Sequence, residues 1–196
     1  MISRLRKLIK PLSLRVGKWL GRHGIEPNVL TSLGLLISIL VPVSVYYSLL
    51  VVGLALVILS ATLDYLDGAV AKALNKSSSL GAFLDSFSDR VSDFCYSIAL
   101  WLAGIDALYV MLYIATSYLI SYVRARAESL GVKLEGVGLM ERGERTLVII
   151  VIFIIIAATE SLFIPTYIII GMIALNVITI IQRVYYTFRG LSRNEQ

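Results

Sequence analysis

Five aspartates stand in one stretch of the chain that is otherwise rich in apolar residues. They are Asp64, Asp67, Asp85, Asp89 and Asp93. A charged carboxylate in a membrane-embedded helix is costly unless it is paired, solvated or bound to a cation. Residues three or four positions apart share one face of a helix, which pairs Asp64 with Asp67 and Asp85 with Asp89. We expect the two pairs to face each other across a helical hairpin and to bind a cation.

The donor atoms predict which kind of cation this would be. The carboxylates of Asp64, Asp67, Asp85 and Asp89 offer only hard oxygen ligands, and no histidine or cysteine stands among them. Such ligands suit Mg2+, Mn2+ or Ca2+ rather than Zn2+. A pair of such ions can bind the attacking and leaving oxygens of a phosphoryl transfer. The competing interpretation is a set of stray interfacial carboxylates, which membrane burial makes expensive.

Two glycines accompany these aspartates. Gly68 follows Asp67 directly, and Gly81 precedes Asp85 by four residues. Because glycine has no side chain, it lets the backbone approach a ligand closely. We therefore expect room for a bound molecule beside the aspartates.

Arginines that enter the apolar segments of the second half of the chain predict a site for an anion. A guanidinium in a membrane segment is as costly as a carboxylate, and its planar fork can bind a phosphate through two hydrogen bonds. The competing interpretation is that each arginine extends to the membrane surface and reflects the excess of basic residues on one side. The candidates are Arg124, Arg126, Arg142, Arg145 and Arg183.

A short sequence with several polar residues precedes the first apolar span. Residues 26–31 read Glu-Pro-Asn-Val-Leu-Thr and predict the start of a helix, which Asn28 or Thr31 could cap. His23 stands alone beside Gly24 at the preceding helix end, and we expect it on the surface.

Composition places these residues in a membrane protein. The chain has 196 residues, 58% of them hydrophobic, and a mean hydropathy of +0.83. The uncharged stretch between Glu26 and Asp64 suits two spans joined by a turn near residues 46–48. Further apolar stretches follow at about 80–102, 108–126, 146–158 and 164–188. We predict an all-α integral membrane protein with six transmembrane helices in residues 25–190 and a frayed tail at 191–196.

Residues 1–24 predict an amphipathic helix on the membrane surface. Apolar residues recur at helical spacing on one side, and lysines and arginines cover the other. Pro11 should kink this helix or begin a second piece. A cleaved signal peptide is disfavoured, because the charged stretch is too long and no small-residue cleavage site ends a short apolar core.

The charges predict orientation and partners. The chain carries 18 Lys and Arg against 13 Asp and Glu, a net charge of +5. The turns expected near residues 46–50, 103–107 and 158–164 contain no basic residue, which places both termini and the aspartates on the cytoplasmic side of the cell membrane. Because the basic residues flank apolar spans, we expect membrane lipids and phosphate substrates as partners, and no nucleic acid. Cys95 is the single cysteine, so the chain has no internal disulfide, and we expect Cys95 to be a packing residue.

The spacing of the aspartates also resembles that of a known family. Asp64-x-x-Asp67-Gly68-x-x-Ala71-Lys72 is followed, after eight residues, by Gly81-x-x-x-Asp85-x-x-x-Asp89. This pattern closely resembles the signature of the CDP-alcohol phosphotransferases, integral membrane enzymes that make phospholipids. Similarity to the family covers nearly the whole chain, although Lys72 stands where the family usually carries Arg.

The resemblance implies roles for these residues. It implies two Mg2+ or Mn2+ ions held by Asp64, Asp67, Asp85 and Asp89, with Asp89 as the general base. It also implies a site for a CDP-linked lipid, with residues 26–31 near the nucleotide as an alternative to simple capping. The residues of that lipid site would be Asn28, Thr31, Asp64, Gly68, Ala71, Lys72 and Gly81.

Residues 121–150 narrow the resemblance to one branch of the family. They look like the segment found in the phosphatidylinositol phosphate synthases and archaetidylinositol phosphate synthases, where the position of Arg124 is often Lys. This branch implies that the five arginines bind inositol 1-phosphate, that the donor is CDP-diacylglycerol or CDP-archaeol, that CMP is released, and that the protein is a homodimer.

Two alternatives stay open at this point. The nearer one is the same chemistry with another acceptor, such as glycerol 3-phosphate. The distant one is a divalent-cation transporter, which would explain the aspartates but neither the glycines nor the arginines.

Overall fold

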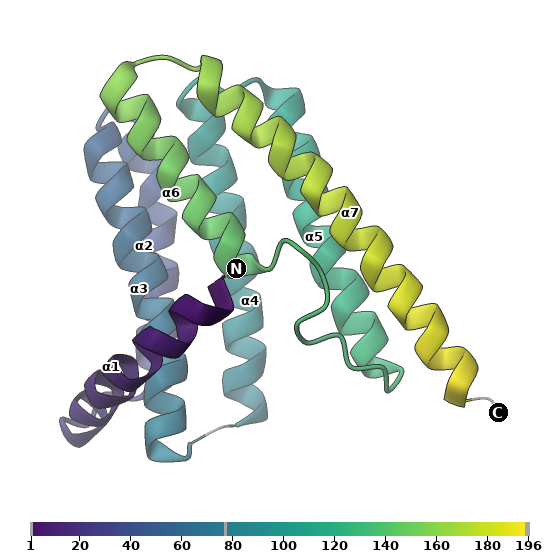
Figure 1. Ribbon diagram of the computed structural model, residues 1–196. Coiled ribbons are helices and arrows are strands. Elements are labelled where there is room, and N and C mark those ends of the chain that lie inside the picture. Colours follow the sequence, from purple (N-terminus) through teal and green to yellow (C-terminus); the bar gives the residue numbers. More distant parts are fainter. Residues whose placement is uncertain (1, 77, 195–196) are drawn as a thin grey trace. The chain divides into compact units, whose positions relative to one another are not determined.

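The computed structural model describes residues 2–76 and 78–194, and all regular secondary structure in these residues is helical (Figure 1). This confirms the predicted all-α class. The chain divides into two compact units, Met1–Ala99 and Leu100–Gln196. The helices are α1 (Ile2–Arg22), α2 (Pro27–Tyr46), α3 (Leu50–Leu74), α4 (Ser79–Leu102), α5 (Ala107–Ser129), α6 (Arg142–Thr159) and α7 (Phe163–Asn194).

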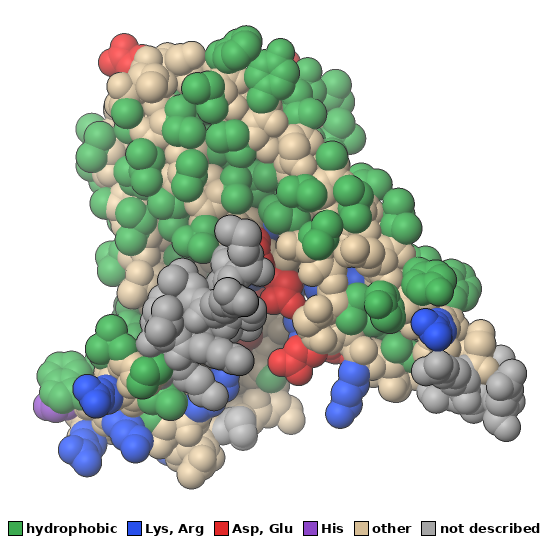
Figure 2. Space-filling view, in the orientation of Figure 1, with side chains coloured by type: hydrophobic (Ala, Val, Ile, Leu, Met, Phe, Trp, Pro, Cys, Tyr) green, Lys and Arg blue, Asp and Glu red, His purple; other side chains and the backbone are tan. Residues whose placement is uncertain are grey.

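Four of the described helices are long and apolar enough to cross a membrane, namely α2, α3, α5 and the Phe163–Ser192 part of α7. In α4 four charged residues interrupt the apolar sequence, and in α6 three charged residues occupy the first turn. Hydrophobic side chains cover much of the visible helix surface in Figure 2, as contact with lipid requires. The chain is therefore a multi-pass membrane protein, and the total of six spans stays a prediction.

The first unit is built on a hairpin of α2 and α3, which turns where the sequence predicts, between Tyr46 and Leu50 (Figure 1). The buried hydroxyl of Ser60 in α3 donates to the Gly34 carbonyl oxygen of α2 at 2.7 Å. The hydroxyl of Tyr96 in α4 donates in turn to Ser60 Oγ at 2.9 Å. Because hydrogen bonds between helices hold apolar segments together where water is excluded, this chain of bonds positions α2, α3 and α4.

The α1 helix packs against α3. It runs as one helix through Pro11, so of the two effects that we expected from this proline, a kink or a second piece, the second piece does not form. An added Cβ at Gly17 would lie 2.8 Å from the carbonyl carbon and oxygen of Ala69, so the absence of a side chain lets the two backbones approach.

In the second unit, α5 lies along α7 and α6 packs against α7 (Figure 1). The fully buried Asn176 of α7 donates from Nδ2 to Thr116 Oγ1 and Ser117 Oγ of α5, each at 3.1 Å. Residues 130–141, between α5 and α6, form an irregular segment. The α7 helix continues through Asn194. Of the tail predicted at residues 191–196, residues 195–196 lie outside the described part of the chain.

Candidate functional site

Three aspartates of the first unit converge. Asp64 and Asp67 lie on α3 and Asp85 on α4, and one carboxylate oxygen from each lies within 4.8 Å of the other two. Asp67 is 5% exposed, and the other two side chains are partly buried. Oxygen ligands at roughly 2.0 to 2.6 Å from a divalent ion stand at most about 5 Å apart. The three carboxylates therefore fit around a hard divalent cation.

Asp89, the fourth predicted ligand, is not a member of this three-residue group in the described part of the chain. It stands on α4 one helical turn after Asp85. Its Oδ2 atom lies 3.6 Å from Nη1 of Arg90, and its side chain is 14% exposed. The structure thus brings together three of the four predicted ligands and places the fourth beside a guanidinium group.

Thr31 joins the aspartate group through Asp67. Its hydroxyl donates to Asp67 Oδ2 at 2.5 Å in a buried contact between α2 and α3, a length typical of hydrogen bonds to a charged acceptor. The cap position of α2 is Glu26, without a side-chain cap, so the capping interpretation of Asn28 and Thr31 is wrong. Proline is favoured in the first turn, and Pro27 therefore starts this helix one residue before Asn28. The Thr31 hydroxyl also lies 3.2 Å from the Pro27 carbonyl oxygen, and its shorter contact is with the Asp67 carboxylate.

The two motif glycines have different surroundings. Among the described residues, no atom beyond the neighbouring backbone of its own helix lies within 4 Å of a Cβ added at Gly68, so the backbone beside Asp67 faces open space. A Cβ added at Gly81 would lie 3.2 Å from Asn28 Oδ1 and 3.1 Å from Ser78 Oγ, so here the missing side chain admits Asn28.

A cavity of about 300 Å3 opens next to this contact. It is lined by Glu26, Pro27, Asn28, Lys76 and Ser78. Of the other predicted donor-site residues, Ala71 is partly buried and Lys72 is exposed. The cavity of the first unit is thus formed by the start of α2 and by the connection between α3 and α4, the two helices that carry the aspartates.

The five predicted arginines of the second unit differ in exposure. Arg145 and Arg183 are buried, with 2% and 3% of their surface exposed. Arg124 and Arg142 are partly buried and Arg126 is exposed. Burial sets Arg145 and Arg183 apart from arginines that merely reach the membrane surface.

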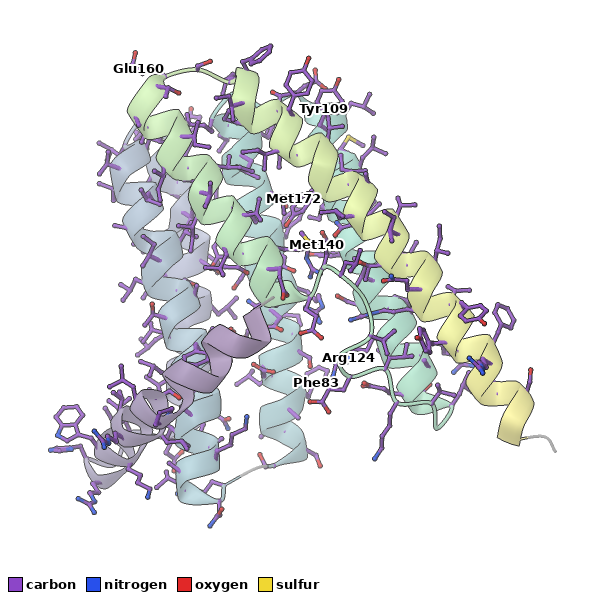
Figure 3. The ribbon with its side chains drawn as sticks, viewed as in Figure 1. Phe83, Tyr109, Arg124, Met140, Glu160 and Met172 are labelled. Carbon is purple, nitrogen blue, oxygen red and sulfur yellow. The ribbon has the colours of Figure 1, made fainter. Side chains whose placement is uncertain are left out.

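The guanidinium group of Arg183 interacts with two of the other predicted arginines. The charge of Arg183 is repelled by those of Arg124 and Arg145 and attracted by those of Glu128 and Glu141. Arg124, labelled in Figure 3, forms an ion pair with Glu128 at 2.9 Å. We call Arg124, Arg145 and Arg183 the arginine cluster, and their proximity favours a bound anion.

The buried arginines also bind backbone carbonyls. Arg183 donates from Nε to the Val137 oxygen and from Nη1 to the Ile120 oxygen, both at 2.9 Å. Arg145 donates from Nη1 to the Met140 oxygen at 3.3 Å. Arg183 has five N–H groups, so two carbonyls leave it capacity to bind an anion as well. These side chains therefore have a structural role whether or not they also bind a ligand.

The remaining sequence predictions concern single residues. His23 is exposed and Cys95 is buried with a free thiol, as expected. Asp93 is 3% exposed and lies on α4 outside the three-aspartate group. Sequence reasoning missed Asn176 and Thr179, although their spacing with Arg183, three and then four residues apart, could have indicated a buried polar face of α7.

Comparisons with known proteins extend these observations. Residues 25–184 match the family described as CDP-alcohol phosphatidyltransferase. The archaetidylinositol phosphate synthase of Pyrococcus horikoshii is 41% identical over 189 residues, which cover 94% of this chain and 95% of that protein.

Solved structures show the same similarity. A crystal structure of the phosphatidylinositol phosphate synthase of Mycobacterium tuberculosis with CDP-DAG bound has a TM-score of 0.77 and 26% identity, covering 91% of this chain and 94% of the other. A second structure of that synthase, in complex with manganese and citrate, has a TM-score of 0.76 and 27% identity, covering 90% and 88%.

The aspartate group generates a first prediction, on metal binding. Asp67→Asn and Asp85→Asn should each weaken Mn2+ binding by about ten-fold or more, because each removes a charged ligand from a hard-cation site. The electron paramagnetic resonance signal of free Mn2+ measures the affinity. Asp93→Asn is the matched control, since Asp93 is a buried aspartate of α4 outside the group, and its affinity should stay near wild type. An equal loss in all three variants would contradict the assignment.

The hydrogen bond of Thr31 generates a second prediction. Thr31→Val keeps the shape of the side chain but removes the donor that orients Asp67, and loss of such an outer contact typically weakens metal binding about ten-fold or more. The same Mn2+ titration measures the effect. Thr31→Ser restores the hydroxyl and should bind Mn2+ nearly as the wild type does. Wild-type affinity in Thr31→Val would show that the bond does not orient the ligand.

Proposed function

The chain belongs to the CDP-alcohol phosphatidyltransferase family, and we propose that it transfers a phosphatidyl or archaetidyl group from a CDP-linked lipid to inositol 1-phosphate, with release of CMP. Membership makes it a transferase of substituted phosphate groups. The observation that carries the choice of acceptor is the arginine cluster, in a chain 41% identical to an archaetidylinositol phosphate synthase.

We assign the donor lipid to the first unit. The open backbone at Gly68, the exposed Lys72 and the cavity beside Asn28 and Gly81 would accept the nucleotide and its pyrophosphate. The ammonium group of Lys72 would meet the pyrophosphate as a point charge. Exposed apolar side chains on α2 and α3 suit the lipid tails of CDP-diacylglycerol or CDP-archaeol. Asp64, Thr31 and Ala71 complete the proposed donor site.

The proposed chemistry is one substitution at phosphorus. A hydroxyl oxygen of the acceptor forms a bond to the β-phosphorus of the CDP-lipid, and the bond from that phosphorus to the bridging oxygen breaks, so that CMP leaves with this oxygen. Asp89 is our candidate general base, which takes the proton of the attacking hydroxyl. When bound, two Mg2+ or Mn2+ ions held by Asp64, Asp67, Asp85 and Asp89 would neutralise the negative charge of the pyrophosphate.

We assign the acceptor phosphate to the second unit. Arg145 and Arg183 are buried, and a phosphate would relieve the repulsion between them and Arg124. Arg142, at the start of α6, and the exposed Arg126 would border this site. Inositol without its phosphate leaves the guanidinium groups without an anion, so it should be a poor acceptor.

The setting in the cell completes the proposal. The positive-inside rule supports a cytoplasmic position for the aspartates and both termini. A homodimer is proposed from the family resemblance. We favour the transferase over a divalent-cation transporter, because the family to which the chain belongs catalyses a reaction in which the aspartates can take part.

A kinetic experiment gives the third prediction. Purified wild-type protein with a CDP-lipid should release CMP rapidly with inositol 1-phosphate and slowly with glycerol 3-phosphate or free inositol. Arg145→Ala should raise the KM for inositol 1-phosphate about ten-fold, since a charge-assisted contact contributes roughly 1.5 to 3 kcal/mol. The KM for the CDP-lipid should stay nearly unchanged.

Arg189→Ala is the matched control, because Arg189 is an exposed arginine of α7 outside the cluster, and it should keep both constants. The acceptor assignment would be wrong if free inositol reacted as well as its phosphate, or if Arg145→Ala weakened both substrates equally. Preference for glycerol 3-phosphate would favour the alternative acceptor.

A further inference from the structure

The α7 helix carries a row of buried polar residues on one face. Asn176, Thr179 and Arg183 are three and four residues apart, and they are 0%, 0% and 3% exposed. Buried polar groups in a membrane protein are costly unless their hydrogen bonds are satisfied. The partners of this row are therefore informative. Asn176 binds α5, Thr179 binds the irregular segment at residues 130–141, and Arg183 binds both.

Thr179 uses its whole hydrogen-bonding capacity on this arrangement. Its Oγ1 accepts the backbone N–H of Leu139 at 3.2 Å and that of Met140 at 3.1 Å. The same hydroxyl donates to the carbonyl oxygen of Leu175 at 2.8 Å. A hydroxyl has one donor and two acceptor positions, so all three are occupied. Without Thr179 Oγ1, two backbone N–H groups of the segment would lose the acceptor that they bind here.

The segment is also shaped to fit against this threonine. A Cβ added at Gly138 would collide with Cγ2 of Thr179, and Gly138 has φ +115, a conformation that side-chain-bearing residues rarely adopt. Further along α7, Arg183 Nε binds the Val137 oxygen, and a Cβ at Gly190 would lie 2.8 Å from Val132 Cγ1. The segment is therefore held along α7 at several points, and Thr179 contacts the end of the segment that leads into α6.

Thr179 is connected to Arg145 through one backbone residue, Met140. Met140, labelled in Figure 3, donates its N–H to Thr179, and its carbonyl oxygen accepts from Arg145 Nη1 at 3.3 Å. The two contacts are on the same residue, two positions before the start of the α6 helix that carries Arg145. A shift of the Met140 backbone would therefore move a partner of the Arg145 guanidinium.

We propose that Thr179 is a positioning residue of the acceptor site, which acts through the backbone of Leu139 and Met140 to set the place of Arg145. This inference rests on the proposed function, in which Arg145 binds the phosphate of the acceptor. Thr179 itself need not contact the substrate.

The test separates this role from a general effect on folding. Thr179→Val keeps the branched shape but removes the acceptor for two N–H groups, and Thr179→Ser keeps the hydroxyl. In Thr179→Val the amides of Leu139 and Met140 should exchange hydrogen faster, and the KM for inositol 1-phosphate should rise about ten-fold with the KM for the CDP-lipid unchanged. Thr179→Ser should restore both. Thr187→Val is the matched control, since Thr187 Oγ1 donates only to the Arg183 oxygen of its own helix in the described contacts, and it should behave as wild type.

A second pair of variants approaches the contact from the segment, in case Thr179→Val does not fold. Gly138→Ala should push the segment away from Thr179 and raise the same KM. Gly136→Ala is its control, because Gly136 also has a positive φ, of 75, but no described residue other than its chain neighbours lies within 4 Å of its added Cβ. It should therefore have a much smaller effect.

The outcomes distinguish this inference from the proposed function. If the wild type releases no CMP with inositol 1-phosphate, the acceptor assignment fails and the inference fails with it. If the wild type is active but Thr179→Val keeps its acceptor KM, or loses affinity for both substrates equally, only the inference is overturned. Unchanged amide exchange at Leu139 and Met140 in Thr179→Val overturns it independently of any substrate.

Discussion

Mutual repulsion among carboxylates in an apolar setting is the constraint on which the first unit depends. Oxygens of Asp64, Asp67 and Asp85 lie within 4.8 Å of one another on helices that are largely apolar. Like charges at this separation favour neutralisation, by a proton or by a cation. A divalent cation bound by all three carboxylates would offset their negative charges at once, provided that α3 and α4 stay in place. The hydrogen bonds from Tyr96 to Ser60 and from Ser60 to Gly34 supply that rigidity.

The second unit has the complementary problem, since its buried charges are positive. Backbone carbonyls of Ile120, Val137 and Met140 accept hydrogen bonds from Arg183 and Arg145 and offset part of the cost of burial. Carbonyl oxygens carry no net charge, however, so the repulsion within the arginine cluster remains. An anionic phosphate is the chemical group that would remove it. The proposed reaction accordingly uses one unit for the donor lipid and the other for the acceptor phosphate.

Much of this could be predicted from sequence, because a membrane limits what a chain can do. The uncharged stretch between Glu26 and Asp64 predicts the α2 and α3 hairpin, and helical spacing predicts that Asp64 and Asp67 share a face. Membership of the family follows from residues at fixed spacing. The sequence also places five arginines in or beside the apolar segments of the second half. It does not show that only Arg145 and Arg183 among them are buried.

Other features depend on geometry that spacing does not encode. Thr31 binds Asp67 because α2 starts at Pro27 and packs on α3 in one particular register, which no local pattern specifies. Asp89 has the spacing of a ligand, yet its carboxylate lies beside Arg90 and outside the group of three in the described residues. The contact of Thr179 with Leu139 and Met140 involves an irregular segment, whose path follows from tertiary packing and not from a repeat.

The most direct test of the central claim, that a divalent cation holds the aspartate group together, is the unfolding temperature of the purified protein during a titration with Mn2+. A ligand that binds only the folded state stabilises it by about 2.7 kcal/mol at a hundred times its dissociation constant. We predict a saturable rise for the wild type as Mn2+ replaces a chelator, and a much smaller rise for a variant with Asp64, Asp67 and Asp85 all changed to Asn. An unfolding temperature of the wild type that is the same in chelator and in saturating Mn2+ would contradict the claim.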